Sequence, residues 1–143
     1  MIYIASDHAG WDLKEYIKKY FNKEGIKYLD LSNPYFDKKD DYPVFAKKVA
    51  GSEYKDRRSK GILICDTGIG MSIAANRKKG IRAALVFNEW MAERARQHND
   101  ANILVLGAEL QSKKKALKMI DVFLSTPFSK AVRHRRRVKI LDI

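Results

Sequence analysis

Cys65, the only cysteine of the chain, lies where a short apolar run ends and a glycine-spaced turn begins, in the segment G-I-L-I-C-D-T-G-I-G-M-S-I-A-A-N at 61–76. The residue types predict a buried strand at 61–64, a tight turn at 67–70 and the first turns of a helix at 71–77. Free N–H groups at the start of this helix are expected to face back towards Cys65. Because a helix N-terminus favours negative charge, it can lower the pKa of the thiol and can also hold an oxyanion or a phosphate.

Familiar cysteine and phosphate motifs do not fit this spacing. A thiol phosphatase loop has an arginine six residues after its cysteine, where this chain has Met71. A nucleotide P-loop closes with Gly-Lys-Ser/Thr, but Gly70 is followed by Met71 and Ser72. A zinc site would need further thiols. An inert buried cysteine is the plain alternative, whereas the glycine turn favours a base or nucleophile beside a backbone anion hole.

Other polar residues lie near the ends of predicted elements. Asp7 and His8 follow the first predicted strand, and His98 and Asn99 end the helix before the fifth strand. We expect them to gather with Cys65 at the carboxyl ends of the strands. Each has a structural alternative, since Asp7 can cap the next helix and Asn99 can belong to a helix-ending turn.

Arg133 and Arg137 are four residues apart, in the cluster R-H-R-R-R that also contains His134. This spacing places both guanidinium groups on one helix face, which suits bidentate capture of a phosphate. A solvated basic helix is the alternative.

Apolar runs alternate with amphipathic stretches along the whole chain. Strands are expected at 2–5, 27–31, 61–65, 81–86 and 103–106, and helices at 11–24, 42–52, 71–77, 89–98, 112–124 and 129–140. A turn-rich segment at 32–41 precedes the second helix. The alternation predicts an α/β fold with one doubly wound, Rossmann-like parallel sheet of five strands, covered by helices on both faces.

The length, composition and charge of the chain restrict the classes of protein to which it can belong. The 143 residues suffice for one domain, 1–143, with a full hydrophobic core. We expect a cytoplasmic protein, because no apolar leader opens the chain, no run approaches the roughly 20 apolar residues of a membrane span, and a single cysteine forms no disulfide framework. The net charge of +12 would suit nucleic acid. The lysines are spread over amphipathic stretches, however, and nucleic-acid binding is not expected as the main role.

The chain resembles the sugar isomerases that comprise ribose-5-phosphate isomerase B and galactose-6-phosphate isomerase. The resemblance covers nearly the whole chain and rests on S-D-H-A-G at 6–10, D-Y-P at 41–43, the segment at 61–76, G-I-R-A-A at 80–84, R-Q-H-N-D-A-N at 96–102 and R-H-R-R-R at 133–137. The segment at 96–99 is more similar to the ribose-5-phosphate branch.

This resemblance implies a homodimer or a dimer of dimers, with each site built across the subunit interface. It also implies interconversion of an aldose phosphate and its ketose phosphate without metal or organic cofactor. Ribose 5-phosphate and ribulose 5-phosphate are the implied pair, and allose 6-phosphate, galactose 6-phosphate or a tetrose phosphate are the alternatives. A non-catalytic phosphosugar- or nucleic-acid-binding module is an alternative of another class.

The resemblance also implies roles for individual residues. Cys65 is the base that moves a proton between C1 and C2 through a cis-enediolate, and His98 helps to open the furanose ring. Thr67 orients the reacting oxygens. Backbone N–H groups of the turn hold the enediolate oxygens, namely those of Gly68, Ile69, Gly70 and Met71. The remaining residues bind substrate: Asp7 and Asn99 contact sugar hydroxyls, Tyr42 lines the pocket, and His8, Arg133 and Arg137 hold the phosphate, with His134 close by.

The chain departs from the family pattern at three places. Asp66 stands where the family has glycine, and its charge would raise the pKa of Cys65 if it pointed inward but not if it pointed outward. Glu109 stands where many relatives have an arginine for the phosphate, a contact that Lys113 or Lys114 would have to replace. Residues 130–132 stand where glycines are common, and we expect this difference to reposition the last helix.

Overall fold

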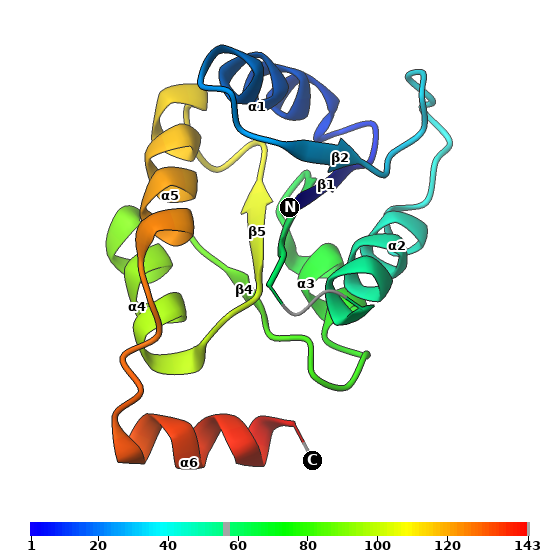
Figure 1. Ribbon diagram of the computed structural model, residues 1–143. Helices are drawn as coiled ribbons and strands as arrows, with labels where there is room; N and C mark the ends of the chain where they lie inside the picture. The colour runs from blue at the N-terminus through cyan, green and yellow to red at the C-terminus, as the bar shows by residue number, and fades with distance from the viewer. Residues whose placement is uncertain (56–57, 143) are drawn as a thin grey trace.

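Five parallel strands form one sheet in the order β2-β1-β3-β5-β4 (Figure 1). The computed structural model describes residues 1–55 and 58–142. The strands are β1 (Ile2–Ser6), β2 (Tyr28–Asp30), β3 (Lys60–Cys65), β4 (Ala83–Leu85) and β5 (Ile103–Gly107). The predicted α/β fold with a five-stranded, doubly wound parallel sheet is therefore confirmed.

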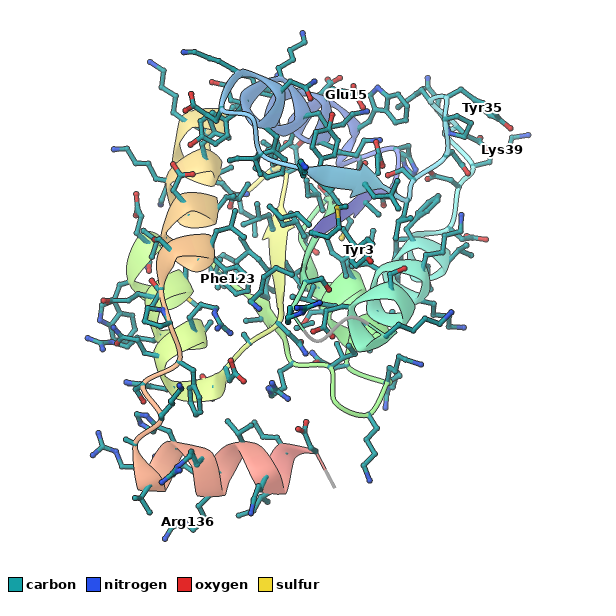
Figure 2. All side chains as sticks on the ribbon, in the orientation of Figure 1. Tyr3, Glu15, Tyr35, Lys39, Phe123 and Arg136 are labelled. Carbon is teal, nitrogen blue, oxygen red and sulfur yellow. The ribbon has the colours of Figure 1, made fainter. Side chains whose placement is uncertain are left out.

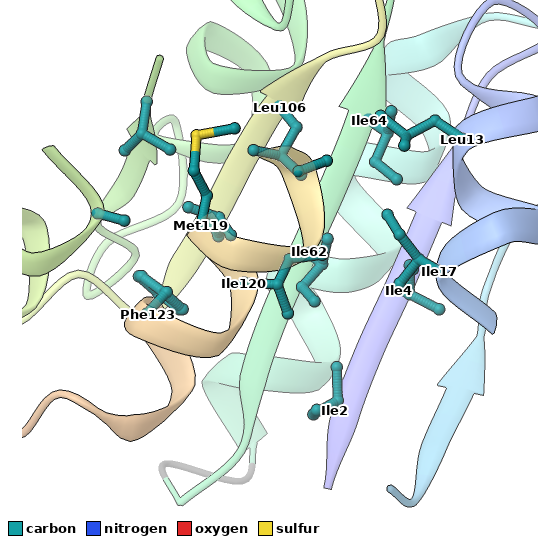
Figure 3. Close-up of a cluster of buried hydrophobic side chains, with 14 of the residues drawn as sticks. Ile2, Ile4, Leu13, Ile17, Ile62, Ile64, Leu106, Met119, Ile120 and Phe123 are labelled. Atoms are coloured by element: carbon teal, nitrogen blue, oxygen red, sulfur yellow. The ribbon is translucent and has the colours of Figure 1, made fainter. Parts of the chain in front are cut away.

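Helices cover both faces of this sheet. They are α1 (Trp11–Lys23), α2 (Tyr42–Lys55), α3 (Ile69–Ala75), α4 (Glu89–Asn99), α5 (Lys113–Ser125) and α6 (Val132–Leu141). Apolar side chains of α1, α4 and α5 pack on one face, in a cluster shown in part in Figure 3. Side chains of α2 and α3 pack on the other face. No helix within the described residues is both long enough and apolar enough to span a membrane.

The alternation of side chains along β3 explains its continuous apolar sequence. Ile62 and Ile64 face the cluster under α1 and α5, and Leu63 and Cys65 face the cluster under α2 and α3. A parallel strand that is buried on both faces is expected to read as an unbroken apolar run. Because of this register, the Cys65 side chain points towards α3.

Several element boundaries differ from the sequence prediction. The third helix begins at Ile69 instead of residue 71, because Gly68 adopts a left-handed conformation with φ +80° and serves as its N-cap. The fourth strand is limited to Ala83–Leu85. The last helix begins at Val132 and not at 129, since Lys130 has φ +56° and interrupts the helical backbone.

The parallel strands give the sheet two distinct edges. The carboxyl edge is where Ser6, Cys65 and Gly107 end their strands, and the amino edge is where Ile2, Lys60 and Ile103 begin theirs. At about 3.3 Å per residue the two edges are about 15 Å apart. α6 lies at the amino edge, beyond the tail of the β5 arrow in Figure 1. In Figure 2, Arg136 lies on α6 at that end, whereas Tyr35 and Lys39 lie in the loop between β2 and α2.

Candidate active site

The thiol of Cys65 lies in a nest of backbone N–H groups at the carboxyl edge. The side chain is buried, and the N–H of Gly68 donates to its sulfur across 3.2 Å. Burial raises the pKa of the thiol above its ordinary value. Backbone hydrogen bonds from Met71, Gly68 and Thr67 lower the pKa, and the charge of Asp7 raises it. The N–H groups face the thiol as predicted, and each lowers its pKa, but burial outweighs them and the net shift is upward.

Gly68 makes this nest possible. Its φ of +80° is a conformation that residues with a side chain rarely adopt. A Cβ at this position would also lie 2.5 Å from the Leu85 side chain and 3.2 Å from the backbone of Leu106. The positive φ turns the chain sharply after β3, so that the first N–H groups of α3 point back at the strand end.

Tyr42 covers the first turn of α3. A Cβ on Gly70 would lie 2.5 Å from Cζ and 2.7 Å from the hydroxyl oxygen of Tyr42. The phenol ring of the first residue of α2 therefore rests directly on the Gly70 backbone, beside the N–H nest. Only a glycine at position 70 leaves room for the ring in this place.

Asp7 follows β1 and is buried close enough to Cys65 for their charges to interact. Its Oδ1 accepts the N–H of Gly10 across 3.0 Å, which stabilises the turn into α1. Burial raises the pKa of the Asp7 carboxyl, and the hydrogen bond from Gly10 lowers it by less. The side chain thus stabilises the turn before α1, whose N-cap is Gly10, and also lies close to the thiol.

His8 is held by a carboxylate that the sequence analysis did not single out. Oδ1 of Asp40 lies 2.7 Å from Nδ1 of His8 and also accepts the backbone N–H of His8 across 3.0 Å. This hydrogen bond raises the pKa of the His8 imidazole. Asp40 belongs to the turn-rich segment, 32 residues away along the chain. No local pattern distinguishes it from its neighbours Asp37 and Asp41.

A second polar group lies at the amino edge. The rings of His98 and His134 are in contact, with centroids 4.3 Å apart, and Ser129 Oγ lies 2.7 Å from Nδ1 of His134. Burial lowers the pKa of His134, and the neighbouring charges of His98, Arg133 and Arg137 lower it further. Both arginines are exposed on α6.

Asn99 completes the amino-edge group, and its backbone is tied to the sheet. Its carbonyl oxygen accepts Nε of Arg82 across 3.1 Å. Arg82 also binds Asp142 at the end of α6, with 2.9 Å between Nη1 and Oδ2. The last turn of α4 and the end of α6 are therefore anchored by one guanidinium group at the start of β4.

One copy of the chain does not bring all predicted site residues together. The carboxyl-edge group contains Cys65 and the N–H nest, Asp7, His8 and Tyr42, whereas the amino-edge group contains His98, Asn99, Arg133, His134 and Arg137. The expectation that His98 and Asn99 lie at the carboxyl ends of the strands is wrong. They end α4, which runs from the end of β4 back to the start of β5, and so they lie at the opposite edge.

Two of the positions that depart from the family pattern lie next to each other on the surface. Asp66 and Glu109 are both exposed, and their backbones are joined by a hydrogen bond of 3.2 Å. Asp66 is not among the main groups that shift the pKa of Cys65. Within the described residues, no three His, Cys, Asp or Glu side chains are grouped as they would be around a metal ion.

Comparison with known proteins assigns the chain to a family. A sequence model described as "Ribose/Galactose Isomerase" matches residues 2–141. The chain is 39% identical over 140 residues to ribose-5-phosphate isomerase B of Mycolicibacterium paratuberculosis, covering 98% of this chain and 88% of that protein.

Solved structures agree with this assignment. A ribose 5-phosphate isomerase from Thermotoga maritima has 50% identity and a TM-score of 0.94, over 99% of this chain and 96% of that one. Ribose-5-phosphate isomerase B from Mycoplasma genitalium, with bound ribulose-5-phosphate, has 44% identity and a TM-score of 0.92, over 98% and 93% of the two chains. The chain therefore belongs to the ribose/galactose isomerase family of enzymes.

Proposed function

We propose that this enzyme interconverts ribose 5-phosphate and ribulose 5-phosphate, with Cys65 as the base. As a member of its family the chain is a sugar-phosphate isomerase. The observation that carries the finer assignment is the buried Cys65 sulfur, 3.2 Å from the Gly68 nitrogen in a nest of N–H groups. The Mycoplasma genitalium protein, similar over 98% of this chain, has ribulose-5-phosphate bound.

Conversion of the open-chain aldose to the ketose requires one proton to leave C2 and one to reach C1. In the proposed step the Cys65 thiolate takes the C2 proton, and the negative charge moves to the C1 oxygen of a cis-enediolate. A proton then passes from the C2 oxygen to the C1 oxygen, the thiol returns its own proton to C1, and C2 becomes the ketone carbonyl. The N–H groups of Thr67, Gly68 and Met71 favour the thiolate. They also lie where N–H groups can stabilise the enediolate oxygens, which is typically worth about 3 kcal/mol for each donor.

Opening the furanose ring requires a proton to move from the anomeric hydroxyl to the ring oxygen. We assign this transfer to His98, since an imidazole exchanges protons readily near neutral pH. In the proposed complex Thr67 orients the reacting oxygens, Asp7 and Asn99 contact sugar hydroxyls, and Tyr42 lines the pocket.

We further propose that each active site joins the carboxyl edge of one copy to the amino edge of a second copy. His98, Asn99, Arg133, His134 and Arg137 then come from the second copy. Exposed apolar side chains near the carboxyl edge support such an interface: Ile69 and Ile73 on α3 are 55% and 54% exposed, and Phe87 and Trp90 near the start of α4 are 42% and 63% exposed. Large apolar side chains exposed together typically mark a protein interface.

In this arrangement the phosphate is held by groups of both copies. His8 lies at the carboxyl edge, and Arg133 and Arg137 approach from the second copy. The exposure of both arginines in a single copy leaves their guanidinium groups available for a bidentate contact with phosphate oxygens.

Turnover of ribose 5-phosphate by the purified protein tests the proposal, with the Cys65→Ala variant as the comparison. We expect the native protein to form ribulose 5-phosphate at roughly 1 to 1000 per second, and Cys65→Ala to lose turnover while still binding the sugar phosphate. Turnover by Cys65→Ala at the native rate would refute the assignment of the base. Faster turnover of allose 6-phosphate, galactose 6-phosphate or erythrose 4-phosphate would reassign the substrate.

A further inference from the structure

Asp40 connects two loops at the carboxyl edge through a single oxygen atom. Its Oδ1 accepts the backbone N–H of His8 across 3.0 Å and lies 2.7 Å from Nδ1 of the same residue. The Asp40 side chain is 5% exposed, whereas the His8 side chain is 39% exposed. The carboxylate is therefore shielded from water, and the imidazole that it holds remains accessible to a ligand.

This double contact fixes which ring nitrogen faces the ligand. A carboxylate accepts hydrogen bonds only, so Nδ1 of His8 must carry a proton to bind Asp40. Nε2, on the other side of the ring, is then the nitrogen that is left for a ligand. A carboxylate that holds one nitrogen of a histidine in this way sets both the tautomer and the orientation of the ring.

The charges around His8 favour its cationic form. The largest electrostatic contributions come from the carboxylates of Asp7, Asp40 and Asp37, and burial opposes them only in part. The hydrogen bond to Asp40 is the largest contribution, and together they raise the pKa of His8. A protonated imidazole has an N–H donor at Nε2, and a hydrogen bond from a cation to a phosphate oxygen is roughly twice as strong as a neutral one.

We propose that Asp40 is a positioning residue of the active site, which orients the His8 imidazole and by its negative charge favours the protonated ring, whose Nε2–H binds the phosphate group of the substrate. This inference rests on the proposed function, in which His8 contacts the phosphate. Asp40 acts through His8 and does not itself touch the sugar.

The Asp40 carboxylate also helps to position Tyr42, a second residue of the pocket. Asp40 comes two residues before Tyr42, whose ring rests on Gly70 beside the thiol. Its own N–H donates to the carbonyl of Asp37 across 3.3 Å, which closes a turn in the loop. The His8–Asp40 contact therefore also holds the loop between β2 and α2 against the strand end of β1.

The variant Asp40→Asn separates charge from geometry. Asparagine retains an acceptor oxygen of similar shape, so the ring can stay in place, but it removes the negative charge. Asp37→Asn is the matched control, because Asp37 belongs to the same loop and interacts with His8 only at a distance, while its carboxylate accepts the N–H of Lys39.

Three measurements apply to each protein: the pKa of His8 by NMR, the inhibition constant of inorganic phosphate, and kcat and KM for ribose 5-phosphate from pH 6 to pH 8.5. The three histidines can be assigned by replacing each with glutamine. In Asp40→Asn we expect the pKa of His8 to fall towards its ordinary value of 6.5. KM and the phosphate inhibition constant should rise about tenfold at pH 8 and less than about threefold at pH 6, with a smaller change in kcat.

The pH dependence distinguishes positioning from a general loss of structure. A merely structural role would change KM equally at pH 6 and pH 8 and would leave the pKa of His8 in place. An unchanged pKa in Asp40→Asn, an equal change of KM at both pH values, or the same effect from Asp37→Asn would overturn the proposal. If Asp40→Asn does not fold, the native protein still decides, because a His8 pKa at or below 6.5 is incompatible with the inference.

Failure of the proposed function would be recognised separately. If the native protein does not turn over ribose 5-phosphate, the substrate assignment falls. An NMR titration with inorganic phosphate alone, followed by the His8 ring signals, then tests Asp40. The native protein should bind phosphate with about tenfold higher affinity than Asp40→Asn does at pH 8. Equal affinities would refute the role of Asp40.

Discussion

The Cys65 thiol and the His98 imidazole lie at opposite edges of one parallel sheet. Cys65 ends β3 at the level of Gly107 in β5, and His98 lies in the last turn of α4, before β5 begins at Ile103. The strands between them are about 15 Å long. The two side chains of one copy therefore cannot act on the same pentose.

Mixing two inactive variants tests whether the site is shared between copies. We expect Cys65→Ala and His98→Asn each to be inactive alone. A mixed dimer has one site that lacks both groups and one site that is intact. About half of randomly exchanged dimers are mixed, and half of their sites are intact. Activity should therefore recover to about a quarter of the native value. Turnover after subunit exchange provides the measurement.

Two controls accompany this experiment. Mixing Cys65→Ala with Cys65→Ser should restore nothing, because both copies then lack the same group. If exchange is verified by mass spectrometry and the first mixture also stays inactive, the shared site is refuted.

The features of this molecule that sequence predicts are those formed by residues close together in the chain. The nest around Cys65 was predictable, because a buried strand, a glycine turn and a helix start lie within a few residues of each other. The alternation of strands and helices likewise indicated the parallel sheet. Local patterns sufficed for both features.

Contacts between distant segments were not predictable in this way. The pair His8–Asp40 joins residues 32 apart, in a loop where three aspartates look alike in sequence. The sequence pattern also does not show at which edge His98 and Asn99 lie, since a position near the end of a helix does not say at which end of the sheet that helix finishes. The pKa of Cys65 depends on how burial compares with the N–H groups, and this balance requires coordinates.

Removing the charge of Asp7 should make the thiol more reactive. The charge of Asp7 raises the pKa of Cys65, so Asp7→Asn should lower that pKa and increase the thiolate fraction at pH 8. We expect alkylation by iodoacetamide to become roughly threefold to tenfold faster, which corresponds to about 0.7 to 1.4 kcal/mol of charge interaction. In both proteins the rate should rise with pH as the thiol ionises.

Asp66→Asn is the matched control for this measurement. Asp66 directly follows Cys65 in the chain but is exposed and is not among the main groups that shift the pKa of the thiol. Its replacement should leave the alkylation rate unchanged. Equal acceleration by both variants would contradict the specific interaction between Asp7 and Cys65.

Alanine at position 68 should destabilise the fold, whereas alanine at position 70 should leave the fold intact and reduce turnover. Gly68→Ala places a Cβ at φ +80° and against the backbone of Leu106, so we expect a loss of about 2 to 4 kcal/mol in the free energy of unfolding. Gly70→Ala meets only the ring end of Tyr42, which is 39% exposed and can turn away. Its stability should change by less than about 1 kcal/mol, because alanine also favours the helix.

Denaturant unfolding and ribose 5-phosphate kinetics separate the two variants. Gly70→Ala should fold normally but lose turnover, since Tyr42 leaves the pocket mouth, and Tyr42→Phe should affect turnover less than Gly70→Ala does. A Gly70→Ala enzyme with native kinetics would show that the position of the Tyr42 ring is unimportant for the reaction.

The ion pair between Arg82 and Asp142 should control the mobility of α6. Asp142 lies 2.9 Å from Nη1 of Arg82, with side-chain exposures of 32% and 13%. Because a partly exposed pair contributes little to global stability, Asp142→Asn should change the free energy of unfolding by only about 0.5 to 1 kcal/mol.

Asp142→Asn should nevertheless accelerate hydrogen exchange in α6 and raise KM for ribose 5-phosphate, because Arg133 and Arg137 lie on that helix. Asp121→Asn makes the same substitution at the carboxylate that accepts from the Tyr20 hydroxyl on α1, and so provides a control away from α6. Exchange in α6 that is equally fast in the native protein and in Asp142→Asn would mean that its contacts with α4, and not the ion pair, hold the helix in place.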